Sequence, residues 1–280
     1  MRGVKKQSLA EKITSTIIII ILLTFSLAPI VWMVSTSFKT TQEQTAIPPT
    51  LIPKNPTISP YIEGWQAKPF NKIFLNTLIV SMITTVLCVV LASLAGYGFS
   101  RFHFRGSNFI LMLLFVSQMF PTSAIIMPYF MLILKLGLLN TRISLILSYT
   151  SFSLPLCVWM LKSFVDSVPK ELDEAAHLDG ASPFQTYRLV ILPLTRPGLI
   201  SATIFTFLNA WKEYLFALTL ANRPEKWMLS VAITSFIGEH ATSWNQMMAV
   251  SLISITPIIL IYLFLQKYLV SGMISGAIKS

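Results

Sequence analysis

The chain has 280 residues, of which 54% are hydrophobic and only 11% are charged, and its mean hydropathy is +0.69. Soluble domains carry about 25% charged residues, so this chain has too little polar surface to cover a water-soluble globule. The composition predicts an integral membrane protein. The net charge of +10 comes from Lys and Arg that flank apolar segments, as membrane topology requires, and does not indicate nucleic-acid binding.

Six apolar segments are long enough to cross a bilayer, whose hydrocarbon core of about 30 Å needs roughly 20 helical residues. They predict an all-α membrane protein with six transmembrane helices in a single domain over residues 1–280. The third segment contains two prolines, so we expect it to kink or end early. The segments are Ile13–Ser35, Leu75–Phe99, Asn108–Leu134, Ile143–Phe164, Gly198–Ala221 and Gln246–Leu265.

The first segment follows a basic stretch, Met1–Lys12. The apolar run is too long for a signal peptide and no small-residue cleavage site follows it, so we expect an uncleaved first helix. An even number of crossings places both termini on one side of the membrane. The basic N-terminus predicts that this side is the cytoplasm.

Between the fourth and fifth segments, residues 167–197 form the longest loop on the predicted cytoplasmic side. The first half predicts a short helix that opens near Pro169, where a missing N–H costs little. Acidic residues, among them Glu174, follow in the first turn, near the positive end of the helix dipole. Gly180 stands where the helix stop needs a positive φ.

The second half of this loop predicts another short helix. Ser182 is the expected N-cap, Pro183 the first helical residue and Gln185 the partner in a capping box, and we expect Pro193 to end the helix. Spacing and capping alone leave two interpretations open: a docking site for a partner, or an amphipathic linker that lies on the lipid headgroups.

A family resemblance favours docking. Glu174-Ala175-Ala176, Gly180 and Leu192-Pro193 resemble the EAA loop of permease subunits in bacterial ABC importers, with Val190 where the family usually has Ile. We call residues 167–197 the EAA loop. Nearly the whole chain resembles the smaller permease subunit of carbohydrate importers of the maltose-transporter type. Residues 209–214 are similar to that family's Trp-Asn-Glu-Phe stretch, with Lys212 where Asn is common, and residues 266–279 look like its C-terminal end.

The resemblance implies a type I permease fold with a cytoplasmic coupling helix pair. It implies half of the translocation pore of an ATP-driven importer for a sugar or oligosaccharide, in the bacterial cytoplasmic (inner) membrane. The implied partners are a second homologous permease, two ATP-binding cassette subunits, an extracellular or periplasmic solute-binding protein and the sugar. The chain has no P-loop, so ATP hydrolysis is expected on other subunits. We expect no enzymatic activity, no cofactor, and no metal site, since the three histidines are scattered and the cysteines form no CxxC.

Two groups of residues are candidates for function. The resemblance implies that ATPase coupling rests on Glu174, Ala175, Ala176, Asp179, Gly180 and Pro193. Polar and ionisable groups inside a crossing are functional candidates, although Lys212 is expected to snorkel outward and a Trp or Gln often packs against a neighbouring helix. The candidates for the translocation path are Gln118, Asn209, Trp211 and Glu213.

Two alternatives stay open. Importers of glycerol-phosphate-like solutes use the same type of permease, so sugar is the favoured substrate class among two. A secondary transporter that works without an ATPase predicts repeated halves and paired charges near the midplane, and neither is visible in the sequence.

Overall fold

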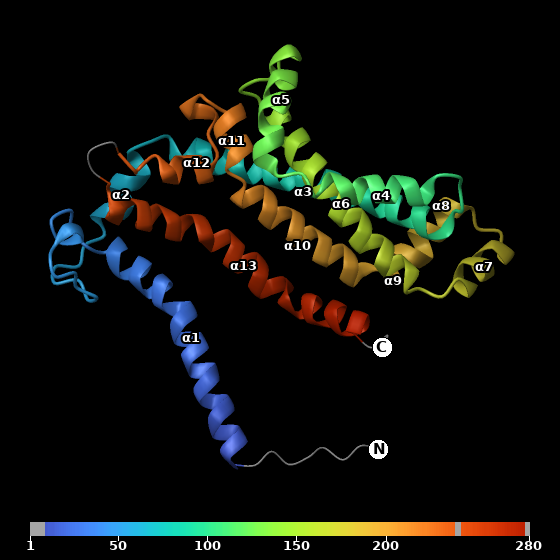
Figure 1. Cartoon of the computed structure of the whole chain (residues 1–280), viewed down its shortest axis with the longest axis horizontal. Coiled ribbons are helices and arrows are strands. Elements are labelled where there is room, and N and C mark those ends of the chain that lie inside the picture. Colours follow the sequence, from blue (N-terminus) through green and yellow to red (C-terminus); the bar gives the residue numbers. More distant parts are fainter. Residues whose placement is uncertain (1–8, 239–241, 278–280) are drawn as a thin grey trace. The chain divides into compact units, whose positions relative to one another are not determined.

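The computed structural model describes residues 9–238 and 242–277 (Figure 1). Within these residues the chain is helical, and its extended pairing is limited to an isolated bridge between Ile237 and Thr242. The predicted all-α class is confirmed. The chain divides into two compact units, residues 1–67 with 234–253 and residues 68–233 with 254–280.

Among the described residues, four helices are long and apolar enough to cross a membrane, and two bent helix pairs bring the number to six if each pair is one crossing. The long helices contain the first, second, fourth and sixth predicted segments. The bent pairs are residues 107–117 with 122–135, at 102°, and residues 183–194 with 196–212, at 79°. The four long helices are α1 (Leu9–Ser37), α3 (Phe70–Arg101), α6 (Arg142–Asp166) and α13 (Trp244–Ala277).

The third predicted segment is broken at a proline. Helix α4 (Ser107–Ser117) ends before Pro121, whose backbone is extended with ψ 131°, and helix α5 (Thr122–Lys135) starts directly after it. Proline lacks the N–H that would continue the helix, which explains the break. Pro128 lies inside α5 without ending it.

The fifth predicted segment is not one helix, contrary to the expectation for residues 198–221. Helix α10 (Arg196–Lys212) ends at Glu213, whose backbone is extended with ψ 132°, and α11 (Leu215–Leu220) follows. The Glu213 carboxylate accepts hydrogen bonds from the backbone N–H groups of Phe216 and Ala217, at 3.0 and 3.1 Å. The side chain caps the start of α11 and replaces helix bonds at the break.

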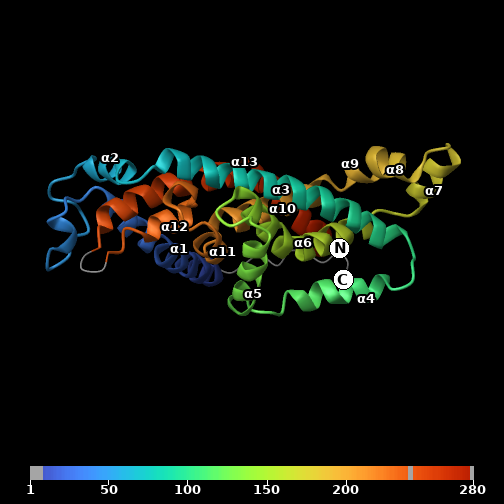
Figure 2. The ribbon, with the colours of Figure 1, turned by 90° about the horizontal axis from the view of Figure 1, so that it is seen from above.

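In the larger unit, α3, α6 and α10 pack side by side (Figures 1 and 2). Small residues line their interface, including Ala92, Cys157 and Ala202. At Gly96 of α3, an added Cβ would lie only 2.8 Å from the backbone nitrogen of Lys162 in α6. The backbones of α3 and α6 therefore approach each other more closely than any side chain at position 96 would allow.

The smaller unit joins α1, the proline-rich loop after it and the start of α13. The ammonium group of Lys39 is buried, lies 4.4 Å from the centre of the Trp32 ring and donates a hydrogen bond to the carbonyl of Thr50. The amide side chain of Asn245 donates to the Lys39 carbonyl at 3.1 Å. The backbone N–H of Lys54 donates to Glu43 and lowers the pKa of that carboxyl.

The other helical elements in the described part of the chain are short. They are α2 (Ser59–Gln66), α7 (Glu171–Leu178), α8 (Pro183–Thr186), a π-helical turn (Tyr187–Ile191), α9 (Leu192–Leu194), α12 (Leu229–Thr234) and two 3₁₀ turns (Glu43–Thr45 and Pro224–Lys226).

Candidate functional site

The first half of the EAA loop contains helix α7, which ends at a glycine as predicted. Gly180 has φ +81°, and its N–H donates to the carbonyl of His177 at 3.0 Å. The next N–H, of Ala181, donates to the carbonyl of Ala176 at 2.9 Å. These bonds satisfy carbonyl groups at the end of the helix and need a left-handed residue, which is usually glycine.

The second half begins with the predicted capping box. The Ser182 hydroxyl accepts a hydrogen bond from the Gln185 N–H at 3.3 Å, and the Gln185 side chain accepts one from the Ser182 N–H at 2.7 Å. Pro183 occupies the first turn of α8. The chain direction after the glycine turn is thus fixed by side chains of the loop itself.

Pro193 does not end the second helix, contrary to the prediction. The chain continues from α8 through the π-helical turn into α9, and the bend comes later, at Thr195. The N–H of Leu192 donates to the carbonyl of Tyr187, five residues back, so the turn is wider than in an α-helix. A wider turn accommodates a proline ring and its missing donor.

The residues predicted to couple to an ATPase lie mostly on the open side of the EAA loop. Glu174, Ala175, Asp179, Gly180 and Pro193 are exposed and Ala176 is half-buried. Leu172 and Leu178 add apolar surface, with 40% and 89% of their area exposed. The loop thus presents small, apolar and acidic groups outward, and the coupling roles of these residues stay a prediction.

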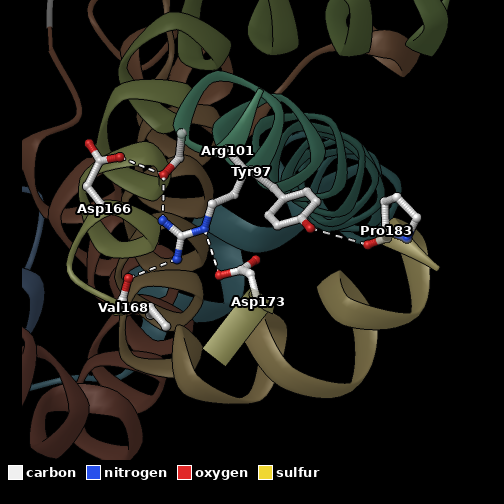
Figure 3. A network of polar contacts seen from close by, with 7 residues as sticks. Tyr97, Arg101, Asp166, Val168, Asp173 and Pro183 are labelled. Atoms are coloured by element: carbon white, nitrogen blue, oxygen red, sulfur yellow. Dashed lines mark hydrogen bonds and ion pairs between the residues drawn. The ribbon is translucent and has the colours of Figure 1, made fainter. Parts of the chain in front are cut away.

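The buried side of α7 carries a contact that the sequence did not reveal (Figure 3). Asp173 accepts a hydrogen bond from the Arg101 Nε at 2.9 Å, and the side chains are only 12% and 7% exposed. Arg101 is the last residue of α3 and also donates to the carbonyl of Val168 at 2.8 Å and to the Ser100 hydroxyl at 3.3 Å. Ser100 in turn donates to Asp166 at 2.6 Å. One guanidinium therefore connects the ends of α3 and α6 with α7.

Two further polar contacts join α3 to the second half of the loop. The Tyr97 hydroxyl donates to the carbonyl of Pro183 at 3.3 Å (Figure 3). The hydroxyls of Ser93 and Tyr187 lie 2.7 Å apart, and the rings of Tyr97 and Tyr187 are 5.3 Å apart. The EAA loop is thus bound to α3 at both of its halves.

A cavity of about 380 Å³ lies where α6, α10 and α11 meet the break between α4 and α5. It contains three of the four residues predicted for a translocation path, namely Gln118, Asn209 and Glu213, and Lys212 joins them. Gln118 also donates to the carbonyl of Phe152 at 3.0 Å. The remaining lining residues are Thr122, Tyr149, Phe152, Ser153, Leu156, Phe205, Ala210 and Phe216.

Trp211, the fourth predicted path residue, is not part of this cavity lining. Its indole N–H donates to the carbonyl of Ser254 at 3.2 Å, and its ring is buried edge-on against Phe74 with 5.7 Å between ring centres. These contacts hold α10 against α3 and α13.

Two sequence observations concern other parts of the chain. The similarity over residues 266–279 rests on side chains that lie outside the described part of the structure. Cys88 and Cys157 are buried free thiols, and the Cys157 sulfur lies 3.1 Å from the Thr206 hydroxyl. They join the packing of α3, α6 and α10.

Comparison with known proteins decides the family. The sequence profile of the family described as the binding-protein-dependent transport system inner membrane component matches residues 88–275. The chain belongs to this family. A sulfoquinovosyl glycerol transport system permease of Agrobacterium fabrum is 35% identical over 92% of this chain and 91% of its own length. A trehalose/maltose transport system permease of Thermococcus litoralis is 33% identical over 98% of this chain and 99% of its own.

A solved structure supports the fold. A chain of a bacterial ABC transporter that imports the acidic polysaccharide alginate superposes with a TM-score of 0.81, at 23% identity, over 95% of this chain and all of that chain. The predicted permease fold is confirmed. The protein is a multi-pass membrane transport subunit and not an enzyme, and permeases of this family work with ATPase subunits and a solute-binding protein. A secondary transporter without an ATPase is accordingly not favoured.

Proposed function

We propose that this chain is one of two homologous permease subunits in an ATP-driven importer of a sugar or oligosaccharide, in the cytoplasmic membrane of a bacterium. The observation that carries the proposal is the EAA loop, a capped helix pair whose outward side is exposed and whose inner side is tied to α3. The sugar class is supported by the names of the two relatives above, whose solutes are glycosides.

In the proposed mechanism, α7 lies in a cleft of an ATP-binding cassette subunit. When two such subunits close around ATP, α7 moves with them, and α6 and α10 follow because the EAA loop joins them. Glu174 contacts the ATPase subunit, while Ala175, Ala176 and Asp179 line the contact. Gly180 fixes the angle between the two halves of the loop. Pro193 restricts the backbone of α9, which connects the loop to α10.

The cavity is the proposed part of the translocation path in this subunit. Amide and carboxylate groups from Gln118, Asn209 and Glu213 face it and can exchange hydrogen bonds with sugar hydroxyls. Phe152 and Phe216 add aromatic surface. This mixture of apolar walls and a few polar groups is typical of small-molecule sites.

The assembly that we propose contains two copies of the ATP-binding cassette subunit, a second permease and a solute-binding protein on the outer side. Both termini and the EAA loop lie in the cytoplasm, and the two compact units act together as a single permease domain. This orientation is supported by the basic residues before α1 and by the positive-inside rule.

The experiment is a purification of the tagged chain in mild detergent from its native host, with identification of its partners by mass spectrometry. We expect a P-loop ATPase and a second six-helix permease. The matched variant is Gly180→Val, which leaves the exposed groups of α7 in place but conflicts with φ +81°, and it should retain the permease while losing most of the ATPase. Recovery of the chain alone, or as a homodimer at every detergent concentration, would refute the proposal.

A further inference from the structure

The end of α3 has a regular stripe of polar side chains that point at the EAA loop. Ser93, Tyr97 and Arg101 follow one another at intervals of four residues, so they lie on one face of the helix. Ser93 contacts Tyr187 and Tyr97 contacts Pro183 in the second half of the loop. Arg101 contacts Asp173 in α7 (Figure 3). No part of α3 is adjacent to the loop in sequence, so these contacts are independent of chain connectivity.

The strongest of the three contacts is the ion pair. Its two side chains are nearly buried, and the guanidinium forms hydrogen bonds to a carboxylate, a carbonyl and a hydroxyl. Charge-assisted bonds of this kind are roughly twice as strong as neutral ones. The second oxygen of Asp173, Oδ1, is buried without a hydrogen-bond partner among the described residues, so Arg101 is the group that balances this carboxylate.

The same segment of α3 is locked against α6. Gly96, three residues after Ser93, touches the backbone of Leu161 and Lys162 so closely that a Cβ would fall 3.1 and 2.8 Å from their atoms. A helix that packs backbone against backbone transmits displacement instead of absorbing it through flexible side chains. A push on α7 therefore reaches α3 through the stripe and α6 through both the chain and this contact.

From these observations we infer that Arg101 is a positioning residue for energy coupling: through Asp173 it attaches α7 to α3, so that α3 moves with the loop in addition to the two helices that the loop connects. The inference rests on the proposed docking of α7 to an ATPase subunit. It adds α3 to the helices, α6 and α10, that would move with the ATPase, and it assigns the attachment of α7 to α3 to the ion pair of Arg101 and Asp173.

The test compares variants of the complete transporter, reconstituted in liposomes with its ATPase, second permease and solute-binding protein. Arg101→Gln removes the ion pair, and Arg101→Gln with Asp173→Asn removes the unbalanced carboxylate as well. The control is Arg105→Gln, which removes the same charge four residues further on, at an exposed position. Uptake and ATP hydrolysis are both measured, together with the amount of ATPase bound to the permease.

We expect Arg101→Gln to lower the ratio of uptake to ATP hydrolysis about tenfold, within the range known for residues that connect two sites, while Arg105→Gln keeps the ratio of the unmodified chain. The neutral double variant should bind the ATPase in normal amounts and keep the low ratio, because its carboxylate is gone but the attachment is still missing. A residue needed only for stability would behave differently, since neutralising the pair would restore both assembly and the ratio.

Two outcomes would overturn the inference. One is an unchanged ratio in Arg101→Gln, and the other is a restored ratio in the double variant. If Arg101→Gln does not assemble with the ATPase, the double variant is the test: a low ratio of uptake to ATP hydrolysis supports the inference, and a restored ratio overturns it. A different result, in which the unmodified chain recovers no ATPase, would instead contradict the proposed function.

Discussion

The two ends of α10 are both interrupted, but the interruptions are held in different ways. At Thr195 the chain turns into the EAA loop, and that loop is bound to the distant helix α3 by Arg101, Tyr97 and Ser93. At Glu213 the helix breaks again, but there the carboxylate bonds to backbone groups only three and four residues ahead. The first end is bound to α3 by side chains of α3. At the second end the Glu213 side chain caps the helix that follows, and the Glu213 carbonyl accepts a hydrogen bond from the Ser230 hydroxyl of α12 at 2.6 Å.

This difference separates two tasks along a single helix. The fastened loop can pass a displacement to α3 and α6, because its contacts span elements far apart in sequence. The self-capped break at Glu213 leaves neighbouring polar groups, Asn209 and Lys212 among them, open to a cavity of about 380 Å³. Changes at the loop end should therefore affect coupling or helix packing, and changes at the cavity should affect passage of the solute.

The largest effect is expected where α3 is locked to α6. Gly96→Ala places a Cβ 2.8 Å from the backbone nitrogen of Lys162 and should force the two helices apart, at a cost of about 1–3 kcal/mol. Thermal unfolding of the purified chain in detergent measures this. The matched control is Gly98→Ala, two residues away, where nothing lies within 4 Å of an added Cβ. Equal melting temperatures for both variants would contradict the close packing.

The next effect is conformational and lies in the loop. Gly180 has φ +81° with open space around it, so Gly180→Val creates no clash but forces a β-branched residue into the left-handed region. That costs about 1–2 kcal/mol or is relieved by turning α7 away. ATPase binding and uptake should fall, and Gly180→Asn should keep most of both because Asn tolerates this region. An Asn variant as defective as the Val variant would argue against the backbone explanation.

A smaller effect is expected at the capping box. Ser182→Ala removes the acceptor for the Gln185 N–H and should cost about 1 kcal/mol of local helix stability. Hydrogen exchange of the α8 amides measures it, and protection should fall there while α6 stays protected. Ser182→Asp keeps an acceptor and should restore protection. Unchanged exchange in the Ala variant would mean that the cap does not stabilise α8.

The smallest effect is expected at the cavity. Asn209→Leu removes one hydrogen-bonding group from the lining and should lower uptake about fivefold, which corresponds to the loss of one hydrogen bond, without loss of bound ATPase. The control is Trp211→Phe, which removes the hydrogen bond to the Ser254 carbonyl outside the cavity. It should lower the melting temperature, and its uptake should fall less than that of Asn209→Leu. A stronger loss of uptake in Trp211→Phe would show that the path follows a different side of α10.

Local sequence rules predicted the parts of this molecule that local groups determine. The positive φ of Gly180, the capping box of Ser182 and Gln185, and the break at Pro121 each depend on residues within a few positions. The long apolar helices were predicted for the same reason, since length and composition alone define them.

The features that the sequence did not predict depend on residues far apart in the chain, or on neighbouring groups that replace lost helix hydrogen bonds. The break at Glu213 has no proline or glycine to announce it, and a side-chain cap replaces the lost bonds. Pro193 did not end its helix because the preceding π-helical turn accommodates it. The ion pair of Arg101 and Asp173 joins residues 72 positions apart, and only the fold brings them together. The sequence showed a basic residue at the end of a predicted helix, Arg101, and an acidic residue on a short helix, Asp173. Nothing in the sequence indicated that these two residues pair with each other.

ATP-driven coupling through the EAA loop is tested by uptake of a labelled glycoside into liposomes that contain the complete assembly, with the solute-binding protein outside and ATP either inside or absent. If the EAA loop couples this permease to an ATPase, uptake requires internal ATP, and replacing Glu174 by Ala together with Gly180 by Val abolishes it. Uptake that proceeds without ATP when a proton or sodium gradient is applied, or that persists in the double variant, would contradict the account.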